Sequence, residues 1–185
     1  MAGRGGPAER GDSGLVVFVP EADALVADLR LEHDPAAAFG VPAHVTILFP
    51  FVPAARIDAG VRERLRELCA SSAPFPYRFE RVERFGETTV YLAPTQPGPF
   101  RALTDLVAAS WPEHPPYGGE FETVIPHLTL GDHLAPGVAE RIERDAASRL
   151  ASVGAISGHA REVLLLVADA EGRFGRDSAY PLGVS

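Results

Sequence analysis

The hydrophobic positions of this chain follow two spacings, one typical of strands and one typical of helices. Runs of roughly four to eight residues that are apolar or alternate between apolar and polar, and that stop at Pro, Gly or polar turn residues, predict strands. Longer segments in which apolar residues recur every three or four positions predict amphipathic helices. The expected strands cover residues 15–19, 44–49, 75–85, 89–93, 127–130, 153–157, 161–168 and 173–180. The expected helices cover residues 21–31, 57–70, 100–111 and 138–150.

The connections between these elements contain the residues that end helices and strands. The first helix is expected to stop at His33-Asp34-Pro35, because the residue before a proline is pushed out of the helical region. A loop of small residues then leads to the strand at 44–49, and a Pro- and Gly-rich surface loop at 114–119 leads toward the strand at 127–130.

The order of the elements indicates a faint internal duplication. The strands at 44–49 and 127–130 are each followed by a loop, a helix and two strands. Alternation of strands and helices without repeated parallel crossovers favours the α+β class. We therefore expect a bilobal fold, with two antiparallel sheets related by a pseudo-two-fold axis and helices packed on the outside. Residues 1–13 are expected to be a disordered tail, and residues 14–185 a single bilobal domain.

The two strands that open the duplicated parts carry the same pattern of His, apolar, Thr, apolar. They read His44-Val45-Thr46-Ile47 and His127-Leu128-Thr129-Leu130. Side chains two apart on a strand share a face, so each His and Thr should face one side and the apolar residues the core. One such pattern could be an ordinary strand. Two copies at comparable places favour a groove that contains two imidazoles and two hydroxyls.

Two imidazoles and two hydroxyls suit the cleavage of a phosphodiester, especially a strained 2′,3′-cyclic one. One imidazole takes a proton from the attacking oxygen and the other gives a proton to the leaving oxygen, on opposite sides of phosphorus. Histidine can serve in either role near neutral pH. The Thr hydroxyls can donate to the non-bridging oxygens of the phosphoryl group. This chemistry predicts a bell-shaped dependence of the rate on pH, with apparent pKa values that belong to the coupled pair.

Both tetrads resemble the motifs of the 2H phosphoesterases, a superfamily that includes 2′-5′ RNA ligases and cyclic phosphodiesterases. That family is marked by two His-x-Thr/Ser-x motifs roughly eighty residues apart. The resemblance implies a bilobal α+β enzyme, a hydrolase or ligase that needs no metal, ATP or other cofactor. Its substrates would be 2′,3′-cyclic phosphates or 2′-5′ linkages of nucleotides or RNA ends. It implies His44 and His127 as the acid–base pair and Thr46 and Thr129 at the phosphate, and leaves open which His is the base.

Three aromatic residues are candidates for substrate binding. Tyr91 has the strand parity of the groove side and is predicted to stack on a base, with an exposed structural tyrosine as the alternative. Phe49 and Tyr117 are secondary candidates, for which core packing or loop anchoring is the alternative.

Charge and composition narrow the class of partner. The net charge is −8 at pH 7, which argues against a protein that coats long nucleic acid and favours a small cyclic nucleotide or an RNA end. The single cysteine, Cys69, allows no internal disulfide and no Cys-based zinc motif. No apolar run has the length of a membrane span, and the first residues lack the apolar stretch of a secretory signal. We therefore expect a monomer in the cytoplasm.

Two alternative hypotheses for the function of the groove stay open. A metal site could use His127 and His133, which share strand parity with Gly131 between them. Metal sites usually add carboxylates or closely paired His ligands, whereas the residue two positions after each motif His is a Thr. The other reading is a non-catalytic protein that binds a nucleotide or phosphate in the same groove without turning it over.

Overall fold

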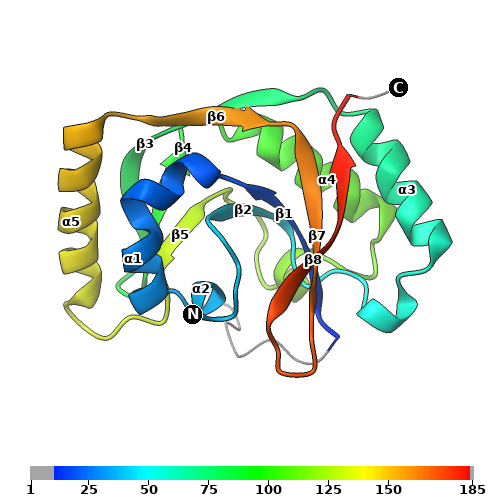
Figure 1. Ribbon diagram of the computed structural model, residues 1–185, viewed down its shortest axis with the longest axis horizontal. Coiled ribbons are helices and arrows are strands. Elements are labelled where there is room, and N and C mark those ends of the chain that lie inside the picture. The colour runs from blue at the N-terminus through cyan, green and yellow to red at the C-terminus, as the bar shows by residue number, and fades with distance from the viewer. Residues whose placement is uncertain (1–10, 184–185) are drawn as a thin grey trace.

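The computed structural model describes residues 11–183, and two four-stranded antiparallel sheets form its centre (Figure 1). The first sheet has the order β2 (His44–Leu48), β1 (Ser13–Phe18), β7 (Glu162–Ala168) and β8 (Phe174–Pro181). The second has the order β5 (Leu128–Gly131), β4 (Thr89–Pro94), β3 (Phe75–Phe85) and β6 (Ile156–Ala160).

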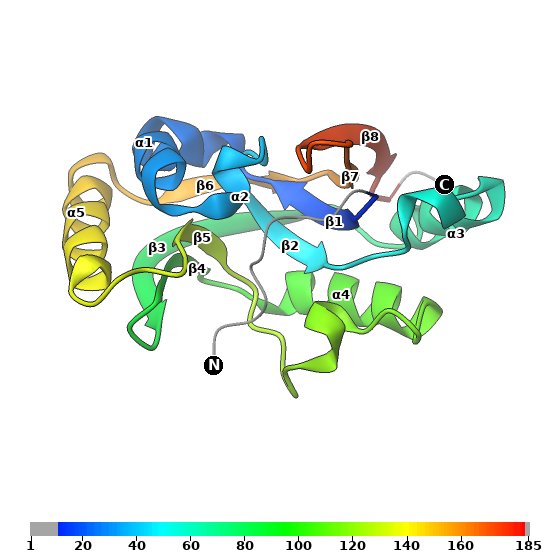
Figure 2. The same ribbon diagram turned by 90° about the horizontal axis from the view of Figure 1, so that it is seen from below.

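The two sheets are built in the same way from the motif strands outward. In each sheet the motif strand, β2 or β5, lies at the edge and pairs with the strand that precedes it in the chain, β1 or β4. Helix α1 (Asp23–His33) follows β1 but packs against β5, and helix α4 (Gly98–Ser110) follows β4 but packs against β2. This exchange brings β2 and β5 into contact where the lobes meet (Figure 2). The predicted bilobal α+β fold is confirmed.

The remaining helices cover the outer parts of the sheets. Helix α3 (Ala59–Ala70) packs against β8, and α5 (Val138–Val153) packs against β3 and β4 at the opposite end of the molecule (Figure 1). Their apolar positions face inward, as the helical spacing predicts. Short helical turns complete the chain: η1 (Pro20–Ala22), α2 (Pro35–Ala38), η2 (Ala54–Arg56) and η3 (Pro116–Gly119).

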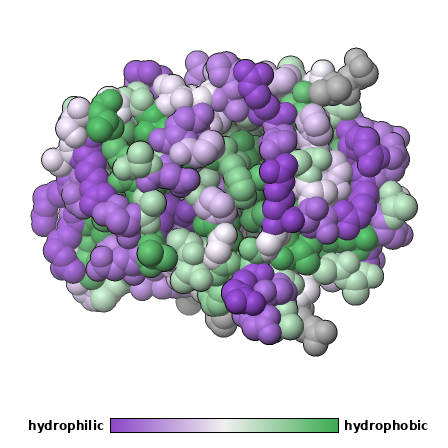
Figure 3. All heavy atoms as spheres, in the orientation of Figure 1, coloured by the Kyte–Doolittle hydropathy of each residue, from purple (hydrophilic) through white to green (hydrophobic). Residues whose placement is uncertain are grey.

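Apolar side chains pack on both faces of the first sheet. One large cluster fills the space between the sheets and under the helices, and it includes Phe51, Phe79 and Phe100. A smaller cluster with Val16 and Leu164 packs on the other face of β1 and β7. On the face seen in Figure 3, apolar side chains show in patches between polar ones. Among the described residues no helix is long and apolar enough to cross a membrane.

Most predicted boundaries lie within two residues of the observed ones, but the end of the N-terminal tail and the start of β6 are wrong. Residues 11–13 do not belong to a disordered tail, because Ser13 is buried in β1 and its Oγ donates to the Val52 carbonyl at 2.6 Å. The rest of the predicted tail, residues 1–10, lies outside the described residues. The strand predicted from Val153 begins only at Ile156, because α5 continues to Val153 and ends at Gly154, whose φ of +84° suits glycine.

Gly158 allows a close contact between the two lobes, and we expect Gly158→Ala to lower the free energy of unfolding by about 1–3 kcal/mol. Tyr77 is opposite Gly158 in the sheet, and its hydroxyl donates to Glu21 of η1 at 2.6 Å. A Cβ at Gly158 would lie 2.5 Å from both the Tyr77 hydroxyl and a Glu21 carboxylate oxygen. Denaturant unfolding measures the loss.

Gly175→Ala is the matched control for this variant. Gly175 also lies in a strand, and an added Cβ there meets nothing within 4 Å. We expect a change of no more than about 0.5 kcal/mol. Equal stability of the two variants would show that the Tyr77–Glu21 contact does not constrain residue 158.

Candidate active site

The motif strands show the alternation that their sequence predicts. The apolar residues Val45, Ile47, Leu128 and Leu130 are at most 1% exposed and face the core. The two His and two Thr residues of the tetrads are half-buried on the opposite faces. His127 directly precedes the first residue of β5. Its side chain is two residues from Thr129 and lies on the same face.

Each motif histidine is held by the backbone two residues before it. His44 Nδ1 lies 2.8 Å from the Pro42 carbonyl oxygen, and His127 Nδ1 lies 2.7 Å from the Ile125 carbonyl oxygen. A carbonyl oxygen only accepts, so Nδ1 of each neutral ring carries the hydrogen and donates it. In both half-sites this leaves Nε2 as the nitrogen that can exchange a proton with a substrate.

The two rings lie at one place, where β2 meets β5. They are close enough that a positive charge on His127 lowers the pKa of His44. Acid–base catalysis at one phosphate requires that the two imidazoles lie close together. Only then can one reach the attacking oxygen and the other the leaving oxygen of the same phosphorus. His44 and Thr46 of β2 thus lie near His127 and Thr129 of the second tetrad, and their catalytic roles stay a prediction.

The surroundings of the two histidines differ. Burial lowers the pKa of His44 to about 3, and the nearby Arg30 guanidinium acts in the same direction. Burial also lowers the pKa of His127, but the Ile125 carbonyl and the charges of Asp132 and Asp34 oppose that shift. Both rings are therefore neutral at pH 7 in the free site, and nearby carboxylates favour a proton on His127 alone.

The low pKa of His44 predicts that stability falls as the solution becomes acidic. The unfolded histidine takes up a proton near pH 6.5 and the folded one only near pH 3, so between these values the unfolded state binds more protons. Each unit of pKa difference corresponds to about 1.4 kcal/mol. We expect His44→Gln to remove about 1–2 kcal/mol of the stability loss between pH 7 and pH 5. Urea unfolding at both pH values measures this, and an unchanged loss in the variant would contradict it.

Sequence reasoning missed three charged residues around the groove. Arg30 and Asp34 form a buried ion pair with 2.7 Å between Nη2 and Oδ2. Asp132 follows β5 directly, accepts from the Thr89 hydroxyl at 2.6 Å, and donates its backbone N–H to the His33 carbonyl. These residues give the groove its uneven charge.

Tyr91 has the predicted face but cannot be the predicted stacking platform. It pairs with Thr129 across the strands and packs edge-on against His127, with 5.4 Å between ring centroids. It is only 3% exposed, and Phe85 stacks on it at 4.1 Å. A base could reach the Tyr91 ring only by displacing Phe85, so the prediction for Tyr91 is wrong. Tyr91 instead supports the imidazole of His127.

The other two aromatic candidates lie together at the end of β2. Phe49 is half-buried and packs edge-on against Phe174, with 6.1 Å between ring centroids. The Tyr117 backbone N–H donates to the Phe49 carbonyl at 2.7 Å, and the Tyr117 hydroxyl reaches Thr46. Burial raises the pKa of Tyr117 to about 12, so the phenol keeps its proton. Tyr117 thus adds a hydroxyl to the groove, and Phe49 stays a proposed base contact.

The alternative metal site would use His127 and His133. In the described part of the chain, no group of three or more His, Cys, Asp or Glu residues is placed to hold a metal ion. Strand β5 ends at Gly131, and His133 has a φ of +54° beside Asp132 on the exposed side of the turn.

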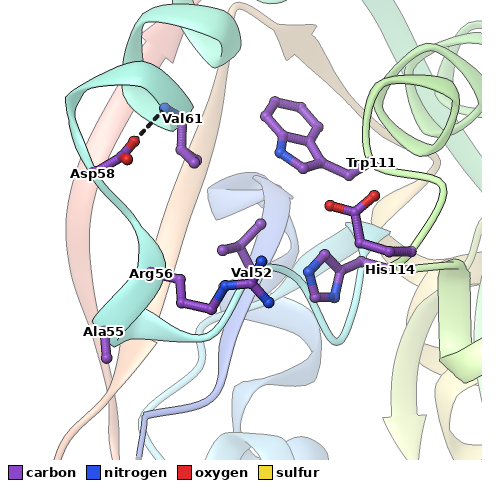
Figure 4. A pocket seen from close by; sticks show the side chains of 8 residues that line it. Val52, Ala55, Arg56, Asp58, Val61, Trp111 and His114 are labelled. Atoms are coloured by element: carbon purple, nitrogen blue, oxygen red, sulfur yellow. Dashed lines mark hydrogen bonds between the residues drawn. The ribbon is translucent and has the colours of Figure 1, made fainter.

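A separate cavity of about 350 Å³ lies between η2, the start of α3 and the end of α4 (Figure 4). Trp111 and the valines Val52 and Val61 form its apolar side, and charged side chains, among them Arg56, form its rim. None of the four motif residues lines this cavity, so it is distinct from the groove.

The comparisons with known proteins agree with this arrangement. The family model described as the 2′-5′ RNA ligase superfamily matches residues 18–169, which include both tetrads. No curated protein matches the chain.

Solved structures share the whole architecture. The structure titled E. coli LigT in apo form has a TM-score of 0.61 and 17% identity, over 95% of this chain and 99% of that one. LigT complexed with 3′-AMP has a TM-score of 0.57 and 17% identity, over 96% and 99%. TT0787 of Thermus thermophilus has a TM-score of 0.59 and 18% identity, over 93% and 98%. These likenesses concern the fold, and the family match rests on the sequence. Together they show that the chain belongs to the 2′-5′ RNA ligase superfamily, within the 2H phosphoesterases that its two tetrads resemble.

Proposed function

We propose that this protein is a metal-independent phosphoesterase that opens 2′,3′-cyclic phosphates or cleaves 2′-5′ linkages of nucleotides or RNA ends. The observation that supports it is the matched pair of half-sites on β2 and β5. In each one, a histidine with its Nδ1 tied to a backbone carbonyl lies beside a threonine on the same face. If a 5′-hydroxyl attacked the 2′,3′-cyclic phosphate in place of water and the bond from phosphorus to the 3′ oxygen broke, the same site would form a 2′-5′ linkage, which is RNA ligation.

In this proposal a phosphodiester lies between the two Nε2 atoms. One imidazole takes the proton of the attacking water, and the other protonates the leaving ribose oxygen on the opposite side of phosphorus. The hydroxyls of Thr46 and Thr129 donate to the non-bridging oxygens, where negative charge builds up in the transition state. Thr is stiff about χ1, which keeps these donors aimed.

Small substrates fit the charge of the protein best. The net charge of −8 disfavours a long polyanion, whereas a single phosphate can be held by local donors. Among structures of similar fold, LigT has been crystallised with 3′-AMP, ATP and NADP+. We therefore propose a small cyclic nucleotide or an RNA end as substrate. One chain supplies both half-sites, so a monomer suffices.

Turnover of 2′,3′-cyclic AMP tests the proposal against a non-catalytic binder. We expect conversion to adenosine monophosphate, at the same rate with and without EDTA. The alternative is a binder that uses the same groove without catalysis. Its melting temperature would rise with 3′-AMP, but it would convert neither 2′,3′-cyclic AMP nor 2′-5′-linked dinucleotides.

Removal of either motif hydroxyl should slow turnover less than removal of a histidine. For Thr46→Val and Thr129→Val we expect a rate loss of about 10²-fold, as for a single oxyanion donor. Valine has nearly the same shape and both positions are half-buried, so the fold should be kept. Steady-state rates measure the effect, with Thr88→Val, an exposed turn threonine, as control. Unchanged rates in both motif variants would remove the hydroxyls from the mechanism.

A further inference from the structure

Arg30 is a buried cation that contacts the segments carrying both tetrads. It projects from α1 and is 3% exposed. Its Nε lies 3.1 Å from the carbonyl oxygen of Thr129, the threonine of the second tetrad. Its Nη1 lies 3.1 Å from the carbonyl oxygen of Val41, three residues before His44. One side chain thus binds the backbone of both half-sites.

Asp34 fixes the direction of the Arg30 guanidinium. One carboxylate oxygen accepts from Arg30 Nη2 at 2.7 Å and from Nε at 3.1 Å. The other accepts from the backbone N–H of Ala36 at 3.0 Å, which caps the short helix α2 that leads to β2. Asp34 is 4% exposed, so the pair is shielded from water. The Arg30 guanidinium is thus bonded to two backbone carbonyls and one carboxylate.

The contact matters because the motif strands do not pair with each other. In the part of the chain that the structure describes, β2 is hydrogen-bonded to β1 and β5 to β4, in separate sheets. The distance between β2 and β5 therefore depends on side-chain contacts and on the loops that connect the strands to their neighbours. Arg30, before β2, reaches the backbone of β5. Tyr117, before β5, reaches in return the Phe49 carbonyl and the Thr46 hydroxyl at β2.

The same residues place unlike charges beside the two histidines. The Arg30 guanidinium acts on His44, whereas the carboxylates of Asp34 and Asp132 act on His127. Tyr117, near Thr46, keeps its proton and adds no charge. A bound phosphodiester brings one negative charge, which favours a proton on one imidazole. That proton is better placed on His127, near the carboxylates, than on His44, near the guanidinium.

We propose that Arg30 and Asp34 are positioning residues that hold the two half-sites in register and make His44 the base and His127 the acid. This inference rests on the proposed function for its chemistry. In hydrolysis of a cyclic phosphate, His44 Nε2 takes a proton from water as the water oxygen bonds to phosphorus. The bond from phosphorus to one ribose oxygen breaks, and that oxygen takes the proton from His127 Nε2. Proton exchange with solvent restores the pair.

The variants Arg30→Lys and Arg30→Met/Asp34→Leu separate geometry from charge. The double variant removes both charges together, so that no unpaired charge is left buried. With 2′,3′-cyclic AMP we expect its kcat to fall about 10²-fold with little change in KM, because small misplacement of catalytic groups costs that much. Its acidic limb should move to higher pH, since His44 then holds a proton more readily. Arg30→Lys keeps the charge, so kcat should fall while the acidic limb stays.

Arg149→Met is the matched control. Arg149 also joins a carboxylate and a distant carbonyl, those of Asp28 and Leu25, but its side chain is 31% exposed and its bonds are to residues outside both tetrads. It should leave kcat and the pH profile unchanged. A folded double variant with the kcat and pH profile of the wild type would overturn the positioning role. A shift of the basic limb to higher pH in place of the acidic one would overturn the assignment of His44 as base.

Titration of the imidazoles by NMR tests the inference without turnover. In the free wild-type protein His44 should take up its proton at a lower pH than His127, and the difference should shrink in the double variant. The reverse order in the wild type would overturn the inference even if the enzyme is active. Correct titration without turnover of any phosphodiester would count against the proposed function alone.

Discussion

Replacement of either motif histidine by alanine is expected to slow the hydrolysis of 2′,3′-cyclic AMP by about 10²- to 10⁴-fold, the usual contribution of general acid–base catalysis. Each variant keeps one half-site but loses a proton donor or acceptor on one side of phosphorus. Since the two histidines act as a unit, the double variant should be about as slow as the slower single variant. Initial rates over a range of substrate concentrations measure kcat and kcat/KM.

His159→Ala is the control for the histidine variants. His159 is exposed on β6 and belongs to neither tetrad, so its removal should leave the rate unchanged. The wild-type rate should follow a bell-shaped pH profile, because one imidazole must be neutral and the other protonated. Wild-type activity in His44→Ala or in His127→Ala would refute two-histidine catalysis.

Arg30→Met alone is expected to lower the free energy of unfolding by about 3–5 kcal/mol, because it leaves the Asp34 carboxylate buried without its counter-charge. Burial already raises the pKa of Asp34, and Arg30 is the main opposing charge. The loss should therefore be smaller at pH 4 than at pH 7, since protonation of Asp34 relieves it. Guanidinium chloride unfolding at both pH values measures the effect.

The double variant Arg30→Met/Asp34→Leu should recover much of that stability, because apolar replacement of both members of a buried pair is often neutral. Arg149→Met, which breaks exposed ion pairs, should cost no more than about 1 kcal/mol. If Arg30→Met is as stable as Arg149→Met, then the Arg30–Asp34 pair contributes no more than a surface pair.

Elements bounded by strong local signals were predictable from sequence. Strand β3 runs from Phe75 to Phe85 as predicted, since apolar and polar residues alternate along its first half and a Gly-Glu turn follows it. The start of β6 was misplaced, because Val153 prolongs the apolar spacing of α5 and was assigned to the next strand. The glycine that follows it was the available signal, since a left-handed glycine commonly ends a helix.

Some residues of the candidate site could be predicted from local sequence patterns, and others could not. The tetrads could be predicted, because His, Thr and their apolar neighbours lie within four residues of one strand. The contact between Arg30 and Thr129 joins residues 99 apart in sequence, which no local pattern shows. The sequence did contain a weak signal for the buried pair. Arg30 lies on the same side of α1 as the buried Val26, and Asp34 follows Arg30 by four residues. Parity placed Tyr91 on the correct face, but it could not show that Phe85 covers the ring.

The central claim is that His44 and His127 face one phosphate. A crystal structure of the protein with 3′-AMP tests it most directly. We expect the phosphate between the two Nε2 atoms, each within hydrogen-bonding distance, with the hydroxyls of Thr46 and Thr129 on its remaining oxygens. A phosphate bound elsewhere, or held by one half-site with the other imidazole turned away, would contradict the claim.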